Sequence, residues 1–225
     1  MPAFRYPQFC ALARACEMLG ERWTLLIVRE LLLGPKRFSD LRARLDGISP
    51  SVLTERLTRL EQLGLVGRFT LPPPAASTVY ELTDHGRALR PAVFELIRWG
   101  GRFLHPVRKG ERIEPDWMLL ALDACARRGP SPPRTFQLRI RDQGKEAILY
   151  VIGGPSGTVV TDTHAAAEVT IVASVPATLS VMSGAMDPLE ALKAGRIKAT
   201  GDHAALAEFP QLFDVVRPEP QKRPA

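Results

Sequence analysis

One segment, GISPSVLTERLTRLEQLGLV (residues 47–66), restricts the fold of this chain more than any other. Leucine recurs across it every three or four residues, which is the spacing of an amphipathic helix. Ser49 is suited to the N-cap and Pro50 to the first helical position, while Gly64 is suited to ending the helix. The segment therefore predicts a helix that starts at Pro50 and ends before Gly64.

The face of this helix opposite the leucines is polar without being a ladder of charges. At 100° per residue, Ser51, Glu55 and Thr58 lie opposite the leucines, and Thr54 and Arg59 flank them. Such side chains donate or accept hydrogen bonds at base edges or phosphates, as a helix in the major groove of DNA must. The alternative is a small helical core domain whose polar face is simply solvated.

The surrounding segments have the order of a winged helix-turn-helix. The expected elements are helices at 11–19, 22–33 and 40–45 (the last capped by Ser39), strands at 65–71 and 78–83, and a helix at roughly 84–104. Pro91 lies inside this last helix, so a kink or an earlier restart of the helix is the alternative there. Glu55 could accept from cytosine or pair with Arg59 one turn on. The residues expected to contact double-stranded DNA, at base edges or phosphates, are Arg37, Ser49, Ser51, Thr54, Glu55, Thr58, Arg59 and Arg68.

The distribution of charge also indicates that the first half of the chain is the part that binds DNA. Residues 1–104 contain 15 lysines and arginines against 10 aspartates and glutamates, a net charge of +5, whereas residues 105–225 contain 15 against 14. A polyanion is therefore expected to bind the first half. The chain lacks a membrane-length apolar run, metal-like spacing of cysteines and histidines, and catalytic motifs. We expect a cytoplasmic protein that is not an enzyme, with no metal, no cofactor and no membrane partner.

The segment from CALARACEMLGERW through RFSDL and GISPSVLTERLTRLEQLGLVGR to VYELTDHGRAL resembles the HxlR-type, MarR-like family of bacterial winged-helix regulators. The resemblance covers about residues 10–104. It implies a homodimer, formed by the first and last helices of the domain, that binds a roughly two-fold DNA site without catalysis. The wing tip LPPPAASTV departs from the family by lacking a basic residue, so the wing is expected to touch DNA through main-chain groups or to add little affinity.

Cys10 lies thirteen residues before Trp23, where the family often has a cysteine. In some members this position resembles a redox or electrophile sensor, and the second half would then be a passive dimerisation or partner-binding module. Sensing requires an exposed thiol with a lowered pKa, and Arg14 is the evident nearby cation. The alternative is that Cys10 and Cys16 are small apolar residues on a dimerising helix.

A polar, proline-bounded segment, HPVRKGERIEP, divides the chain. The fold class expected is α+β, with a winged-helix DNA-binding and dimerisation domain at 1–104, a linker at 105–115, a smaller α+β domain at 116–215 and a disordered tail at 216–225. The second domain is expected to contain a helix at 116–128, strands at 134–142, 145–152, 157–162 and 168–174, helices at 176–183 and 187–194, a strand at 195–201 and a last helix at 202–213.

Residues 169–213, with the motifs SGAMDP and GRIKATGD, resemble the C-terminal part of sterol-carrier-protein-like domains. That fold implies an antiparallel sheet covered by helices, with an apolar tunnel for a lipid-like effector. The expected lining is Ile148, Tyr150, Ile171, Leu179, Met182, Met186, Leu189, Leu206, Phe209 and Phe213. The same pattern is required for a solid core, which is the alternative. Arg139, Arg141 and Lys145 could face an anionic head group or be solvated strand residues.

Overall fold

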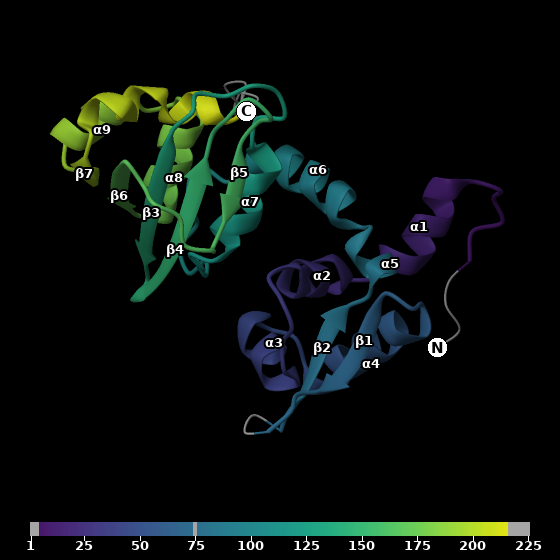
Figure 1. Ribbon diagram of the computed structural model, residues 1–225. Coiled ribbons are helices and arrows are strands. Elements are labelled where there is room, and N and C mark those ends of the chain that lie inside the picture. The colour runs from purple at the N-terminus through teal and green to yellow at the C-terminus, as the bar shows by residue number, and fades with distance from the viewer. Residues whose placement is uncertain (1–4, 74–75, 216–225) are drawn as a thin grey trace. The chain divides into compact units, whose positions relative to one another are not determined.

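The first part of the chain folds because apolar residues recur at helical spacing between capped ends. The computed structural model describes residues 5–73 and 76–215, and its contacts divide the chain into two compact units, Met1–Val93 and Phe94–Ala225 (Figure 1). The predicted tail at 216–225 and part of the wing tip lie outside the described residues. Among those described, no helix is long and apolar enough to cross a membrane.

The first unit has the order of a winged helix-turn-helix, as predicted (Figure 1). Its elements are α1 (Ala11–Leu19), α2 (Thr24–Leu32), α3 (Phe38–Arg44), α4 (Pro50–Gln62), β1 (Val66–Thr70), β2 (Thr78–Leu82) and α5 (Asp84–Arg87). β1 and β2 form an antiparallel hairpin. The buried residues Ile27, Leu41, Leu53, Leu57 and Leu60 bring α2, α3 and α4 into one core.

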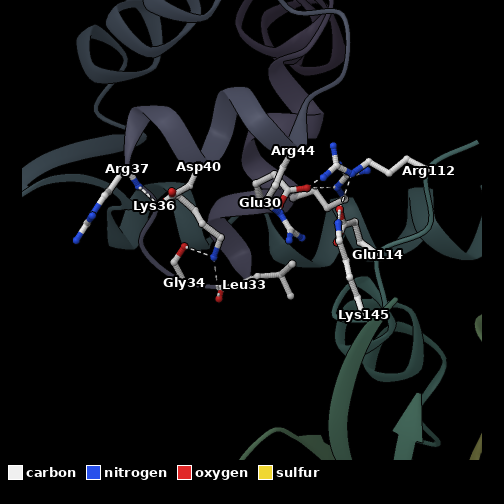
Figure 2. Close-up of polar contacts among 11 residues, drawn as sticks. Glu30, Leu33, Gly34, Lys36, Arg37, Asp40, Arg44, Arg112, Glu114 and Lys145 are labelled. Atoms are coloured by element: carbon white, nitrogen blue, oxygen red, sulfur yellow. Dashed lines mark hydrogen bonds and ion pairs between the residues drawn. The ribbon is translucent and has the colours of Figure 1, made fainter. Parts of the chain in front are cut away.

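A buried carboxylate joins α2 to α3. Glu30 is inaccessible to solvent, forms an ion pair of 2.6 Å with Arg29, and accepts a short hydrogen bond from Arg44 of α3 (Figure 2). Because a buried charge is costly unless it is paired, this contact fixes how the two helices meet. Arg44 is therefore used in a contact inside the domain.

The motif YELTDHG positions the base of the wing. The Thr83 hydroxyl donates to the carbonyl of Gly64 at 2.6 Å and accepts from the amide of Gly86 at 3.1 Å, which caps α5. A Cβ on Gly86 would lie 2.0 Å from the carbonyl oxygen of Leu65, so only glycine allows this close approach. The end of α4 and the end of the hairpin are thereby held together.

The predicted start of the third helix was wrong. α3 begins at Phe38, and Arg37 rather than Ser39 is at its N-cap, because the Asp40 carboxylate accepts from the Arg37 amide at 3.0 Å and completes the first turn. The segment predicted as a helix at 84–104, with a kink or restart possible at Pro91, forms two helices, α5 and α6 (Arg90–Gly101). Pro91 has no N–H to donate, so it is accommodated in the first turn of a new helix.

The second unit contains a five-stranded sheet of order β5-β4-β3-β6-β7. Its elements are α7 (Trp117–Cys125), β3 (Thr135–Asp142), β4 (Lys145–Ile152), β5 (Val159–Thr161), β6 (Val169–Ala173), α8 (Val175–Met182), α9 (Pro188–Lys193), β7 (Ile197–Gly201) and the 3₁₀ helix η1 (His203–Leu212). The predicted α+β fold is confirmed. The β3–β6 pair is parallel and the other pairs are antiparallel, so the sheet is mixed.

One face of this sheet packs against the helices. Phe136, Leu138 and Ile140 of β3 are buried with Met182 of α8 and Phe209 of η1 in a single apolar cluster. Rings of this cluster meet edge to face, with centroids 5.1 Å apart for Phe136 and Phe209. The helical layer therefore covers one face only, and the other face carries the alternate residues of each strand.

The prediction that Ile148 and Tyr150 face the helices was wrong. Tyr150 pairs with Gln137, and its hydroxyl accepts from the Gln137 amide at 2.8 Å, on the face that the helices leave uncovered. Ile148 lies two residues away on the same strand and is 41% exposed. Apolar residues occur on both faces of β4, so alternation alone could not show which face meets the helices.

The end of the segment predicted as a linker is held by the β3–β4 turn. Gln143 accepts from the Ile113 amide at 3.2 Å and donates to the Glu111 carbonyl at 3.0 Å. Glu114, which is 3% exposed, lies 2.5 Å from Lys145 and also from Arg112 (Figure 2). Lys145 is therefore engaged in an internal ion pair and not in a head-group site.

Candidate nucleic-acid interface

Helix α4 separates apolar from polar side chains as its sequence predicts. Leu53, Leu57 and Leu60 are at most 1% exposed. The residues predicted to face DNA, Ser49, Ser51, Thr54, Glu55 and Thr58, are all exposed, and Arg59 is half-buried beside them. The helix therefore presents a continuous row of small hydroxyl-bearing side chains with one cation at its edge.

Local hydrogen bonds decide what these hydroxyls can offer to a ligand. Ser49 caps α4 by accepting from the Val52 amide at 3.3 Å, and its Oγ lies 3.0 Å from Oγ of Ser51. The Thr54 hydroxyl donates to the Pro50 carbonyl at 2.9 Å. Thr54 is thus left with acceptor lone pairs and a methyl group, which suit an amino group or a thymine methyl in the major groove.

Glu55 does not pair with Arg59, the partner considered for it from the sequence. Its carboxylate lies 3.4 Å from Arg56 and not against Arg59. Arg56 is only 15% exposed and also pairs with Glu21 at 2.9 Å. Arg56 is therefore an internal link between α4 and the segment before α2, whereas Arg59 has no ion-pair partner among the described residues.

Three arginines predicted to contact DNA lack an ion-pair partner in the described structure. Arg37, Arg59 and Arg68 form no ion pair within residues 5–73 and 76–215. Arg37 extends from the N-cap of α3 (Figure 2). Arg68 lies on β1 opposite Tyr80, with its guanidinium 5.9 Å from the ring centroid, so a stacked ring orients it. Guanidinium groups without an acidic partner, such as these, are suited to phosphates.

Arg42 of α3 is a further exposed cation that was not predicted from the sequence, and it also has no ion-pair partner in the described part of the chain. Arg42 and Arg44 are indistinguishable by local pattern. Only the tertiary contact between Arg44 and Glu30 shows which of the two is free to meet a ligand.

Cys10 is exposed and occupies the N-cap position of α1. The nearby cation considered for it, Arg14, pairs with Glu17 at 3.0 Å, and Glu17 also accepts from the Tyr6 amide at 2.7 Å. The amide hydrogen bond, followed by the Arg14 guanidinium, lowers the pKa of the Glu17 carboxyl. The charge of Arg14 is therefore compensated by Glu17, and exposure is the feature that the structure gives the Cys10 thiol.

The residues predicted to line a ligand tunnel have different environments. Ile171, Met182, Leu206, Phe209 and Phe213 are buried in the apolar cluster, and Leu179, Met186 and Leu189 are partly buried against it. Phe209 and Phe213 pack edge to face at 5.3 Å. Arg139 and Arg141 both pair with Glu146, at 3.0 and 2.8 Å, so neither faces a head group. The Arg139 hydrogen bond, ahead of that from Arg141, lowers the pKa of the Glu146 carboxyl.

Comparison with known proteins assigns the two parts of the chain separately. Residues 18–108 match the HxlR-like helix-turn-helix family, and residues 120–214 match the SCP-2 sterol transfer family. These matches agree with the winged-helix order of the first unit and with the helix-covered sheet of the second.

Two curated relatives each match less than half of this chain. The HTH-type transcriptional regulator YvaP of Bacillus subtilis is 41% identical over 93 residues, which are 41% of this chain and 86% of that protein. YodB of the same organism is 39% identical over 92 residues, 41% of this chain and 82% of YodB. The structure of reduced YodB is 36% identical and covers 45% of this chain and all of that chain, with a TM-score of 0.39. YodB has also been solved in a quinone-bound form. With identity of this level over most of YvaP and YodB, the chain belongs to the HxlR-like helix-turn-helix family.

Proposed function

We propose that this protein is a homodimeric transcription regulator that binds a specific DNA sequence through α4 and a small apolar effector through its second domain. The observation that carries the DNA-binding part is the polar face of α4, whose hydroxyl groups are exposed while Arg37, Arg59 and Arg68 have no acidic partner in the described structure. The regulators YvaP and YodB, similar to this chain over the same residues, support it.

The proposed roles divide between affinity and specificity. Arg37 and Arg68 would bind phosphates and fix the register of α4 on the duplex. Ser51, Thr54 and Thr58 would lie in the major groove, where they read base edges, and Arg59 would contact a guanine or a phosphate. A homodimer would place two copies of α4 one helical turn apart on a two-fold site.

Selection of bound duplexes from a random library tests this function directly. We expect enrichment of a motif with two related half-sites whose centres are about 10 base pairs apart. Fluorescence anisotropy with the selected duplex and with a scrambled duplex, at several salt concentrations, then measures specificity. Equal affinity for both duplexes would reject sequence-specific binding by α4.

The effector part of the proposal is supported by the match of residues 120–214 to a sterol transfer family and by partly buried Leu179, Met186 and Leu189 at the edge of the apolar cluster. Native mass spectrometry of the protein as purified would detect a retained small molecule and the dimer together. An effector acts only if it binds the DNA-competent and incompetent states with different affinity. The selected duplex therefore serves as the readout when candidate effectors are added.

A second candidate function is thiol-based sensing by Cys10, with a passive second domain. It is favoured by the exposure of Cys10 at the positive end of α1, and by YodB, a relative that has been solved in a quinone-bound form. Treatment with diamide or a quinone should then release the wild-type protein from its duplex and leave Cys10→Ser bound. Cys16→Ser, an exposed cysteine on the same helix, is the matched control. Release of Cys10→Ser by the same treatment would reject this function.

A further inference from the structure

A surface groove of about 460 Å³ lies among α6, α7, α8 and the last described residues of the second unit. Trp99 and Leu104 form one wall, Ala121 and Cys125 of α7 another, and Leu179 and Met182 of α8 a third. The groove is within the usual size range of small-molecule sites. Its location is separate from the core between sheet and helices, which Phe136, Phe209 and Phe213 fill.

The groove takes residues from both family matches. Trp99 and Leu104 come from the helix-turn-helix match at 18–108, whereas Ala121, Cys125, Leu179 and Met182 come from the sterol transfer match at 120–214. Neither matched segment can form the groove alone. All of these residues lie in the second unit, Phe94–Ala225.

The walls are suited to an apolar group. Met182 is 5% exposed, Leu179 is partly buried, and the flexible thioether of a methionine adapts to different ligand shapes. Burial, opposed by the more distant charge of Arg98, raises the pKa of the Cys125 thiol. Cys125 is therefore neutral near pH 7 and acts as part of the apolar wall.

The rim carries one uncompensated cation. Arg98 is committed, because it donates to the Ala124 carbonyl at 2.5 Å and forms a short ion pair with Glu95. Asp214, also at the rim, pairs with Arg127 at 3.1 Å. Arg102, one helical turn after Arg98, is exposed and has no ion-pair partner in the described part of the chain. The net charge available to a bound molecule is thus positive.

We propose that this groove binds an amphipathic carboxylate, with its apolar part against Trp99, Leu179 and Met182 and its carboxylate on Arg102. The inference rests on the proposed function, since it gives the effector a site and a chemical class. α6 begins at Arg90, in the first unit, and ends in the groove, so a ligand bound there acts on the helix that joins the two units. It shifts DNA binding if it favours one arrangement of α6.

Isothermal titration of the full-length protein with decanoate, 1-decanol and decyltrimethylammonium tests the site. We expect decanoate to bind at least about tenfold more tightly than the cationic amphiphile, and Arg102→Gln to remove most of this difference while leaving decanol binding unchanged. Arg108→Gln, an exposed arginine outside the groove, is the matched control. Leu179→Trp, which fills the groove, should weaken both decanoate and decanol, and its thermal unfolding verifies that it folds.

Three outcomes would overturn the inference: no binding of decanoate, equal binding of the three amphiphiles, or unchanged decanoate affinity in Arg102→Gln. A groove closed by a second copy of the chain would appear as decanoate binding only in a monomeric variant, which also overturns it. Affinity for the selected duplex, measured without decanoate, keeps the two proposals distinguishable. If the duplex binds but decanoate does not, only the groove is rejected. If no duplex is bound, DNA recognition is rejected while the titration still decides the groove.

Discussion

At the scale of single residues, the pairing of each charged side chain decides whether it serves the fold or a ligand. Arg44 pairs with the buried Glu30 and Arg56 pairs with Glu21, whereas Arg37 and Arg59 have no acidic partner in the described structure. The guanidinium group therefore stabilises the fold at some positions and is available to a ligand at others. Substitutions at the two kinds of position should have different effects.

Arg37→Ala and Arg59→Ala are predicted to affect DNA binding in different ways. Loss of a phosphate contact at Arg37 should weaken all duplexes alike and lower the slope of log K against log salt by about one. Loss of a base contact at Arg59 should cost about 1–3 kcal/mol at particular base pairs only. Anisotropy with the selected duplex and its single-base variants measures both. A uniform loss for Arg59→Ala would reassign this residue to the backbone.

The contact between Arg134 and Glu208 predicts a pH dependence of stability. Arg134 lies 2.8 Å from Glu208 of η1, and its hydrogen bond lowers the pKa of the Glu208 carboxyl below the ordinary value of 4.5. The bonds to Glu208 and Glu168 raise the pKa of Arg134. A carboxyl whose pKa is lowered by folding adds stability above pH 4.5, and this stability is lost as the pH falls through the folded pKa. Glu208→Gln should therefore lower Tm at pH 7 and reduce the loss of Tm between pH 7 and pH 3.

Glu190→Gln in α9 is the control for this prediction, since the Glu190 side chain has no ion pair within the described residues. Thermal unfolding followed by circular dichroism measures both variants. Parallel pH profiles for Glu208→Gln and wild type would contradict the assigned role of the pair.

At the scale of elements, capping decides where the helices of the DNA-binding unit begin. Ser49 caps α4 and Thr83 caps α5 through side-chain oxygens, while Asp40 closes the first turn of α3 from inside the helix. Ser39 lies one residue inside α3, and its hydroxyl is directed to Asp40 at 3.5 Å. The two serines therefore differ in role although both precede apolar helical patterns.

This difference predicts unequal effects of two similar substitutions. Ser49→Ala should lower the free energy of unfolding by about 1 kcal/mol, because the Val52 amide loses its acceptor. Ser39→Ala should change it by less than about 0.5 kcal/mol, as expected for an exposed position without a capping bond. Urea denaturation of both variants provides the measurement. An equal cost for the two would show that Ser39 contributes to the start of α3.

At the scale of the whole molecule, apolar side chains at the start of α1 are exposed. Phe9, just before the N-cap, is fully exposed and Leu12 of α1 is 71% exposed, although both are large and apolar. Monomeric proteins rarely expose large apolar patches, and a second copy of the chain would cover these side chains. This agrees with the homodimer of the proposed function.

Leu12→Glu is accordingly predicted to give a monomer and to weaken binding to the two-fold duplex by at least tenfold, since each half-site is then bound separately. Native mass spectrometry gives the assembly state and anisotropy gives the affinity. Leu96→Glu tests whether the exposed face of α6 shares the interface. A dimer that survives both substitutions would place the interface elsewhere.

The sequence by itself determined the features that depend on neighbours three or four positions apart: the extent of α1 and α4, the Ser49 cap, and the polar face of α4. It also determined the order of helices and strands in both domains. Only the tertiary structure decided which arginines are free, which face of β4 meets the helices, and that Glu114 pairs with Lys145. The physical reason is that these outcomes depend on contacts between residues distant in sequence, which no local pattern contains. The groove beside α6 belongs to the same class, because its three walls come from segments that are not adjacent in the sequence.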